Sequence, residues 1–280
     1  MFKDIFSKIK HKEDKKEKFT DKTRLKNLIG FAKNAFHFSV THTNCPDHYD
    51  NKVFDFIRML ADRINYDYVK KTVVHEPDYH GLDLQDLFIP INQKLNDEYD
   101  LSRNIYNDKT GYKPNTTFTV ELGKDPVLSF PWKRESLKKV MKYGTDDFPW
   151  EEDTDNHRAD IIFPVGLTWI HSGIHSGFSG ILGRQGVLNI TEKALQYSYY
   201  QIEDWSPLYT YIKFDGENYI FTGYNEEEEL HEVIGKAPCF ELGCIFEIGR
   251  ILHKNGIRFH GITITPKKPQ TEGKEKLNKK

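Results

Sequence analysis

A run of almost uninterrupted apolar residues at positions 159–170 places the strongest constraint on how this chain folds. It reads Ala-Asp-Ile-Ile-Phe-Pro-Val-Gly-Leu-Thr-Trp-Ile and is rich in the β-branched and aromatic residues that favour strands. Such a run suits one strand that is covered on both faces, or two short strands that break at Pro164 and Gly166. We therefore expect residues 159–170 to lie in the interior of a sheet.

This run leads through a glycine-rich turn into a short helix. Residues 169–183 read Trp-Ile-His-Ser-Gly-Ile-His-Ser-Gly-Phe-Ser-Gly-Ile-Leu-Gly, and Ser172 or Gly173 can cap the helix. Each glycine inside a helix costs about 1 kcal/mol relative to alanine, so several of them require a packing or functional reason. We expect Gly177 and Gly180 to leave a groove that another backbone or a ligand can approach. The expected buried face consists of Ile174, Phe178, Ile181 and Leu182.

The start of this helix is the candidate functional site. Unpaired backbone N–H groups and the helix dipole favour anions at such a position, and His175, Ser176 and Ser179 are expected to lie near it. A phosphate or carboxylate would suit that geometry. Of these residues, His175 is the candidate for a catalytic role.

Other interpretations of the same residues remain open. Glycine and serine could simply allow tight packing of helix on sheet, with His171 and His175 bonded to carbonyls. Imidazole and carboxylate are sound metal ligands, but His171 and His175 straddle a turn, so helical spacing between them cannot be assumed. The site is therefore predicted without a metal, and no cofactor is assigned. The alternative metal set would be His157, His171 and His175 with Asp153, Asp155 or Asp160.

A similarity to the AMP-transferring Fic loop is rejected. The match needs an inserted residue, lacks the proline of that loop, and follows a strand where the Fic loop lies between helices. The residues that carry it are His175, Phe178, Gly180, Gly183 and Arg184.

Periodicity along the rest of the chain predicts an α+β fold, with a helical N-terminal half packed on a small mixed-sheet core. The expected regions are a basic flexible extension (1–20), a helical region (21–110), an α+β core (111–265) and a disordered basic tail (266–280). Helices are expected after Asp21, after Asp47, from about Leu82, at 131–143 and at 240–253. Further strands are expected at 116–120, 208–214, 219–222 and 257–264, with a hairpin turn at 215–218.

Composition narrows the class of protein. The chain of 280 residues carries 40 Lys and Arg against 42 Asp and Glu, so its net charge gives no argument for nucleic acid, and a local basic face remains possible. Three scattered cysteines, Cys45, Cys239 and Cys244, are too few for a disulfide framework and indicate reduced thiols in the cytoplasm. No apolar stretch approaches the length of a membrane span.

Several motifs resemble a bacterial family known only as a domain of unknown function. The first is Trp-x-x-x-Gly-x-His-Ser at 169–176, and the second is Phe-Glu-Ile-Gly-Arg at 246–250. Further similarities lie at Phe130-Pro131-Trp132 with Arg134, and at Asp215-Gly216 with Tyr219.

More remotely, the strand, the Gly-x-His turn and the helix resemble the ParB/sulfiredoxin superfamily. That resemblance implies that Gly173, His175 and Ser176 contact a phosphate, possibly of a nucleotide. Ser176 stands where the superfamily has arginine, so the bidentate phosphate contact is missing unless Arg184 or Arg158 replaces it.

Glu247 and Arg250 lie three residues apart in the last expected helix. They can pair with each other, or they can support the turn at His175 from a second layer together with His171.

The leading hypothesis is a cytoplasmic protein that binds a phosphate-bearing ligand at the helix start. One rival is a nuclease or nucleotide hydrolase that uses His175 as its acid–base group, with Glu247 or Asp160 assisting. The other is a non-catalytic interaction module of a phage-defence or mobile-element system, whose N-terminal helices dock a protein partner.

Overall fold

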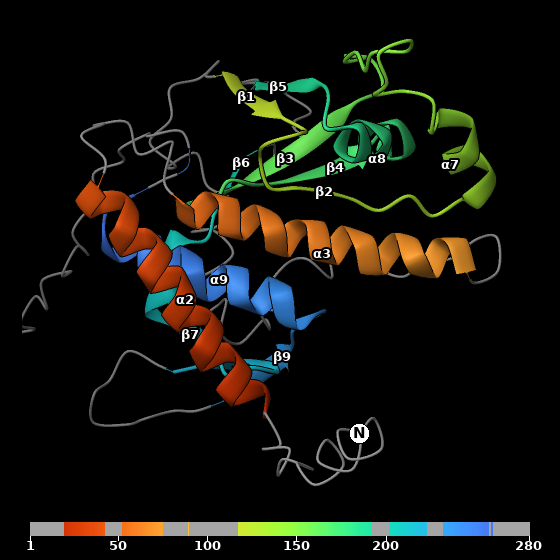
Figure 1. Cartoon of the computed structure of the whole chain (residues 1–280). Coiled ribbons are helices and arrows are strands. Elements are labelled where there is room, and N and C mark those ends of the chain that lie inside the picture. The colour runs from red at the N-terminus through yellow and green to blue at the C-terminus, as the bar shows by residue number, and fades with distance from the viewer. Residues whose placement is uncertain are drawn as a thin grey trace, which may run out of the picture.

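The apolar run forms the middle of a four-stranded mixed sheet in a computed structural model of the chain (Figure 1). β3 (Arg158–Phe163) and β4 (Leu167–Ser172) pair antiparallel, so the run breaks into two strands at Pro164 and Gly166, one of the two expected alternatives. β2 (Val127–Ser129) lies parallel to β4, and β6 (Ile202–Asp204) lies parallel to β3. The structure describes residues 20–42, 52–74, 89, 117–191, 202–222, 232–257 and 259.

Two smaller antiparallel sheets accompany this central sheet. β1 (Thr117–Glu121) pairs with β5 (Val187–Thr191), and Phe118 of β1 packs against Phe163 of β3 at a ring distance of 5.3 Å. The other sheet consists of β7 (Ile212–Phe214), β8 (Asn218–Phe221) and β9 (Glu232–Lys236). The predicted hairpin turn joins β7 to β8, since the carboxylate of Asp215 accepts from the backbone N–H groups of Glu217 and Asn218.

Three long helices pack against one another on one side of the molecule: α2 (Asp21–His42), α3 (Lys52–Val74) and α9 (Phe240–Lys254). α3 is the helix expected after Asp47, and its apolar residues at helical spacing, such as Phe54, Ile57 and Ala61, are buried. The α+β prediction is confirmed, although α9 from the C-terminal half completes the helical layer. Thr20 caps α2, because its hydroxyl accepts from the N–H of Thr23.

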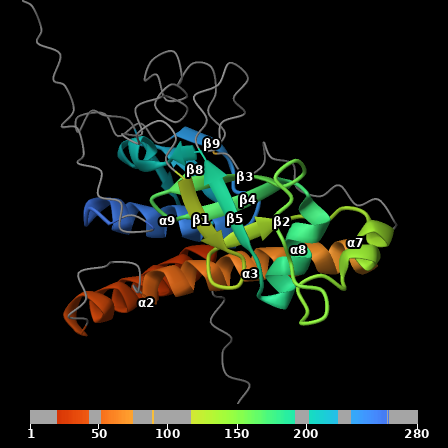
Figure 2. The ribbon, with the colours of Figure 1, turned by 90° about the horizontal axis from the view of Figure 1, so that it is seen from above.

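Two short helices lie at one end of the central sheet, and β8 and β9 lie at the other (Figure 2). α7 (Arg134–Val140) is shorter than the predicted 131–143, since Pro131 and Trp132 precede its N-cap, Lys133. α8 (Ile174–Gly183) is the expected glycine-rich helix. The strand predicted at 208–214 is a 3-10 helix at Ser206–Thr210 followed by β7. The predicted helix from Leu82 and most of the strand at 257–264 lie outside the described residues.

Asn65 on α3 closes the outer edge of β2. Its amide group donates to the carbonyl of Val127 at 2.7 Å and accepts from the N–H of Ser129 at 3.0 Å. The side chain is only 2% exposed, so both ends of the amide are satisfied inside the protein. α3 therefore takes the place of a neighbouring strand along β2.

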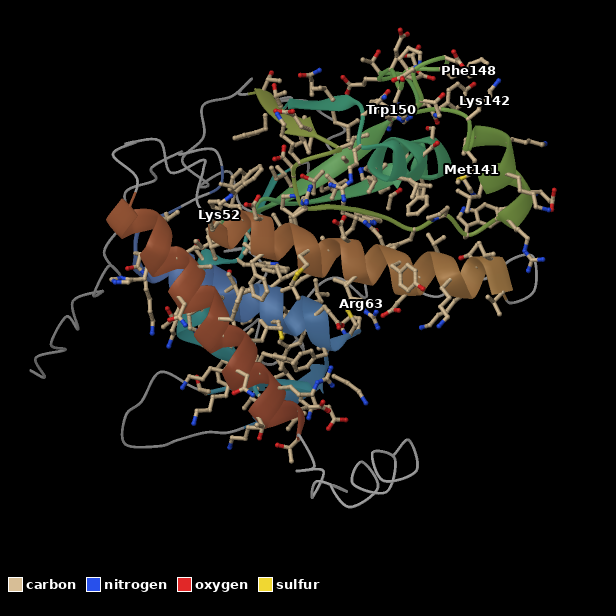
Figure 3. The ribbon with its side chains drawn as sticks, viewed as in Figure 1. Lys52, Arg63, Met141, Lys142, Phe148 and Trp150 are labelled. Atoms are coloured by element: carbon tan, nitrogen blue, oxygen red, sulfur yellow. The ribbon has the colours of Figure 1, made fainter. Side chains whose placement is uncertain are left out.

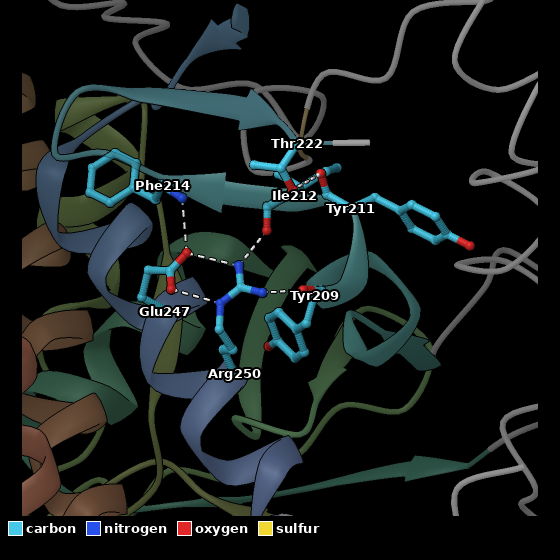
Figure 4. A network of polar contacts seen from close by, with 7 residues as sticks. All are labelled: Tyr209, Tyr211, Ile212, Phe214, Thr222, Glu247 and Arg250. Atoms are coloured by element: carbon cyan, nitrogen blue, oxygen red, sulfur yellow. Dashed lines mark hydrogen bonds and ion pairs between the residues drawn. The ribbon is translucent and has the colours of Figure 1, made fainter. Parts of the chain in front are cut away.

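Arg250 of α9 joins that helix to β7 and the preceding 3-10 helix (Figure 4). Its guanidinium donates to the carbonyls of Tyr209 and Ile212 and pairs with Glu247 at 2.8 Å. Glu247 in turn accepts from the N–H of Phe214 at 2.8 Å. The prediction that Glu247 and Arg250 support the turn at His175 is wrong, because their partners belong to β7 and the 3-10 helix.

Replacement of Arg250 by methionine should lower the free energy of unfolding by about 3–5 kcal/mol, because it leaves the carboxylate of Glu247 buried without its cation. Urea denaturation measures the loss. The double variant Arg250→Met/Glu247→Gln removes the charge as well and should be more stable than Arg250→Met alone. If the free energy of unfolding of Arg250→Met lies within about 1 kcal/mol of the wild-type value, the ion pair does not have this role.

Candidate functional site

The carboxyl ends of two parallel strands meet at the start of α8. β2 ends at Ser129 and leads to Trp132, while β4 ends at Ser172 and leads through Gly173 into the helix. In open sheets, ligands bind beyond the carboxyl ends of parallel strands, where loops and helix starts converge. This is also the place at which the sequence predicted a site.

Gly173 sets the direction in which α8 begins. Its backbone is left-handed (φ 67°), and a Cβ atom there would collide with the ring of His157. Gly173 is the N-cap and offers no side-chain acceptor, and the first helical bond runs from the N–H of Gly177 to its carbonyl at 2.8 Å. Within the described part of the chain, the N–H groups of Ile174, His175 and Ser176 therefore meet no hydrogen-bond acceptor.

His157 and Ser176 form a hydrogen-bonded pair that resembles a nucleophile and its base. In this pair, however, the histidine donates the hydrogen bond, so it cannot act as the base. The N–H of Asp153 donates to Nδ1 of His157 at 2.8 Å, so the ring proton resides on Nε2. Nε2 then donates to Oγ of Ser176 at 2.6 Å, and that hydroxyl donates to the carbonyl of Gly173 at 2.9 Å. His157 cannot accept the serine proton in this state, and the hydroxyl of Ser176 is already used within the protein.

Trp150 covers the same turn (Figure 3). Its indole N–H donates to the carbonyl of Ser176 at 2.7 Å, and its ring stacks on His157 at 4.7 Å. Trp150 is 6% exposed, so this contact is part of the core. Trp150 was not predicted as a site residue, and His157 was predicted only as an alternative metal ligand.

His175 connects α8 to the segment that follows β2. Its Nε2 accepts from the N–H of Lys133 at 3.2 Å, and its ring meets the edge of Trp132 at 5.8 Å. Burial lowers the pKa of His175 below its ordinary value, and the Nε2 contact places the remaining proton on Nδ1. The half-buried, neutral ring lies beside the helix start, as the sequence predicted.

His171 faces away from α8. Ile170 points at Gly177 of α8, so its neighbours on β4, Trp169 and His171, point to the other face of the sheet. There His171 lies 3.6 Å from Oδ1 of Asp160, a contact longer than a hydrogen bond. Burial raises the pKa of Asp160, and His171 offsets only part of that rise.

The three histidines thus have separate neighbours, and the described residues include no group of three side chains arranged to hold a metal. His171 does not support His175 from behind.

Two predicted ligand-binding residues are not at the helix start. Ser179 is 1% exposed, and its hydroxyl lies 2.7 Å from the carbonyls of both Val140 and Tyr143. Arg184 is the C-cap, and ten helical residues place it about 15 Å from the start of α8. The prediction that Ser179 and Arg184 lie near the anion site is therefore wrong.

Glycines, not large apolar residues, form much of the buried face of α8. A Cβ on Gly177 would lie 2.6 Å from Ile170 Cδ1, and one on Gly180 would lie 2.5 Å from Leu122 Cδ1. Gly183 meets the backbone of Gly144 directly. The expected groove is filled by the protein itself, and Leu182, expected to be buried, is 56% exposed.

The sequence as a whole matches the model of a family of unknown function, DUF6710, over residues 5–259. The chain belongs to this family. The expectation of an uncharacterised family is thereby confirmed, while the resemblance to the ParB/sulfiredoxin superfamily stays a prediction. Comparison with curated proteins and with solved structures finds no match. Among the described helices of this DUF6710 member, none has both the length and the apolar character needed to cross a membrane.

Substitution of Gly183 by alanine should destabilise the protein by about 1–3 kcal/mol, because the added methyl group meets the backbone of Gly144. Gly30 on α2 is the matched control, since a Cβ there meets no atom within 4 Å. Gly30→Ala should stabilise by up to about 1 kcal/mol through helix propensity. Thermal or urea unfolding measures the change in stability that each substitution causes. Equal changes for Gly183→Ala and Gly30→Ala would contradict the packing described for α8.

The contribution of His157 and His175 to the free energy of unfolding should rise with pH between about pH 5 and pH 7. Burial lowers the pKa of His157 and of His175, so in this range the unfolded chain binds more protons than the folded protein. Their contribution is complete above the unfolded pKa of about 6.5 and is lost as the pH falls. Urea denaturation across this range should give a shallower slope for His157→Asn/His175→Asn, and an unchanged slope would contradict the assignment.

Proposed function

We propose that this protein binds a phosphate-bearing ligand, with a nucleotide as the leading candidate, at the start of α8. The observation that carries the proposal is the set of three backbone N–H groups, at Ile174, His175 and Ser176, that meet no acceptor within the described residues. Phosphate oxygens satisfy such groups, and the helix dipole adds to the attraction.

We assign to Arg158 the positive charge that arginine supplies in the ParB/sulfiredoxin superfamily, where this chain has Ser176. Arg158 begins β3 and pairs with Ser172, the residue before Gly173, at a β-bulge in the ladder, and its side chain is exposed. A guanidinium binds phosphate through two parallel hydrogen bonds. Arg184 cannot take this role, because it lies at the far end of the helix.

The ring of Trp132 lies against that of His175, at a centroid distance of 5.8 Å. Lys133 Nζ lies 6.0 Å from the centre of the Trp132 ring. An aromatic ring beside a cation suits a base next to a phosphate, which favours a nucleotide over inorganic phosphate.

Binding is favoured over hydrolysis by the state of the polar groups. His157 holds its proton toward Ser176, the hydroxyl of Ser176 donates to Gly173, and Nε2 of His175 already accepts from Lys133. None of these three groups is poised to activate water or a nucleophile. We assign the protein to the bacterial cytoplasm, where the thiols of Cys239 and Cys244, both free, would stay reduced.

A negative charge introduced at Ser172, beside the start of α8, tests the proposal. Nucleotides and inorganic phosphate, each in about tenfold excess over the dissociation constant, should stabilise wild type by about 1.4 kcal/mol and raise its melting temperature by about 3 °C. Ser172→Asp should abolish this shift, because its carboxylate repels the ligand while it favours the helix dipole. Ser172→Asn, of the same size but neutral, should keep the shift, and Arg158→Gln should weaken it.

Isothermal titration calorimetry provides a second measure of the same binding. An unchanged melting temperature of wild type with every nucleotide and with phosphate would refute the proposal. Equal binding by Ser172→Asp and wild type would refute the assigned position.

A further inference from the structure

An exposed apolar stripe runs along the outer face of α3. Met59, Tyr66 and Val73 are spaced seven residues apart, and they are 52%, 60% and 49% exposed. Seven residues make almost two helical turns, so the three side chains lie in one row. Single exposed apolar residues are common, but these three share one of the two positions that are apolar in every seven residues of a helix that packs against another helix.

The opposite face of α3 already packs inside the protein. Phe56, Ile57 and Leu60 belong to the core, and Asn65 is bonded to β2. α3 is therefore apolar on two sides, and only the inner side has a partner within the described residues.

Charged residues alternate with the apolar ones along the outer row in an order that suits a second copy of the same helix. Asp55 lies near the start of α3 and Lys70 near its end, and both are exposed. An antiparallel copy related by a two-fold axis between Asp62 and Arg63 brings Asp55 opposite Lys70 of the partner subunit and Met59 opposite Tyr66 of the partner subunit. Each of these contacts occurs twice, because the interface is symmetric. A parallel copy would instead set like charges against each other.

Phe31 of α2 extends the apolar surface at one end. It is 59% exposed, and its ring packs on Phe56 of α3 at 4.9 Å. In the antiparallel arrangement the C-terminal end of the partner helix, with Val73 and Val74, reaches this region. Val74 is 68% exposed in the single chain.

We propose that the outer face of α3 is the interface of an antiparallel homodimer. The row from Lys52 to Val73 spans about 30 Å, and Lys52 and Arg63 mark its beginning and middle in Figure 3. The charge order selects a second copy of this chain, in antiparallel register, as the partner. This interface is independent of the ligand proposed at α8.

Sedimentation velocity of the full-length protein over a micromolar concentration series tests the proposal. Wild type should approach twice the monomer mass as its concentration rises, and Tyr66→Asp should remain monomeric. Asp55→Lys and Lys70→Asp, each alone, should raise the dimer dissociation constant about tenfold, because each sets like charges opposite each other at two symmetric contacts.

The double variant Asp55→Lys/Lys70→Asp is the deciding measurement. It restores opposite charges across the antiparallel interface and should dimerise more tightly than either single variant, even though both substitutions oppose the dipole of α3. Circular dichroism and thermal unfolding establish that all four variants fold. Monomeric wild type at every concentration would overturn the proposal, and so would a double variant no tighter than the single variants.

Discussion

The close approach of α8 to its surroundings is the constraint on which the candidate site depends. Gly177, Gly180 and Gly183 remove side chains from the buried side of the helix, and the backbone of Gly183 meets that of Gly144. The helix can therefore lie directly on β4 and on the turn after α7. This position points the first N–H groups of α8 toward the carboxyl ends of β2 and β4. Several glycines lower the stability of a helix. This loss is offset because α8 packs closer to its neighbours than larger residues would permit.

Polar side chains hold this framework by bonding to backbone. Asn65 closes the edge of β2, His157 joins a loop to the first turn of α8, and Arg250 joins α9 to β7. Buried polar groups require such partners, because an unpaired one costs about 1–3 kcal/mol. Residue types that often take part in catalysis serve here as structural contacts. The tautomer of His157 is the clearest case, since it leaves Ser176 without a base.

α3 lies between the candidate ligand site at α8 and the proposed dimer interface. Its inner side binds β2 through Asn65, and β2 leads to the segment that contacts His175. Its outer side carries the row of exposed apolar residues from Met59 to Val73. The proposed ligand binding at α8 and the proposed self-association through α3 involve different residues, so each can be tested while the other is intact. A dimer through α3 would also hold two copies of the α8 site in one symmetric particle.

Sequence alone determined the elements with strong local patterns. The period of Phe54, Ile57 and Ala61 indicated α3, the apolar run indicated β3 and β4, and Asp215 with Gly216 indicated a hairpin. It also located the helix start with Gly173 and His175. Only the tertiary structure decided which polar groups were already used. Ser179 bonds to residues 36 and 39 positions away, and Arg250 to carbonyls 38 and 41 positions away. Local spacing cannot report such partners, because hydrogen bonds and burial depend on segments that meet only when the chain folds.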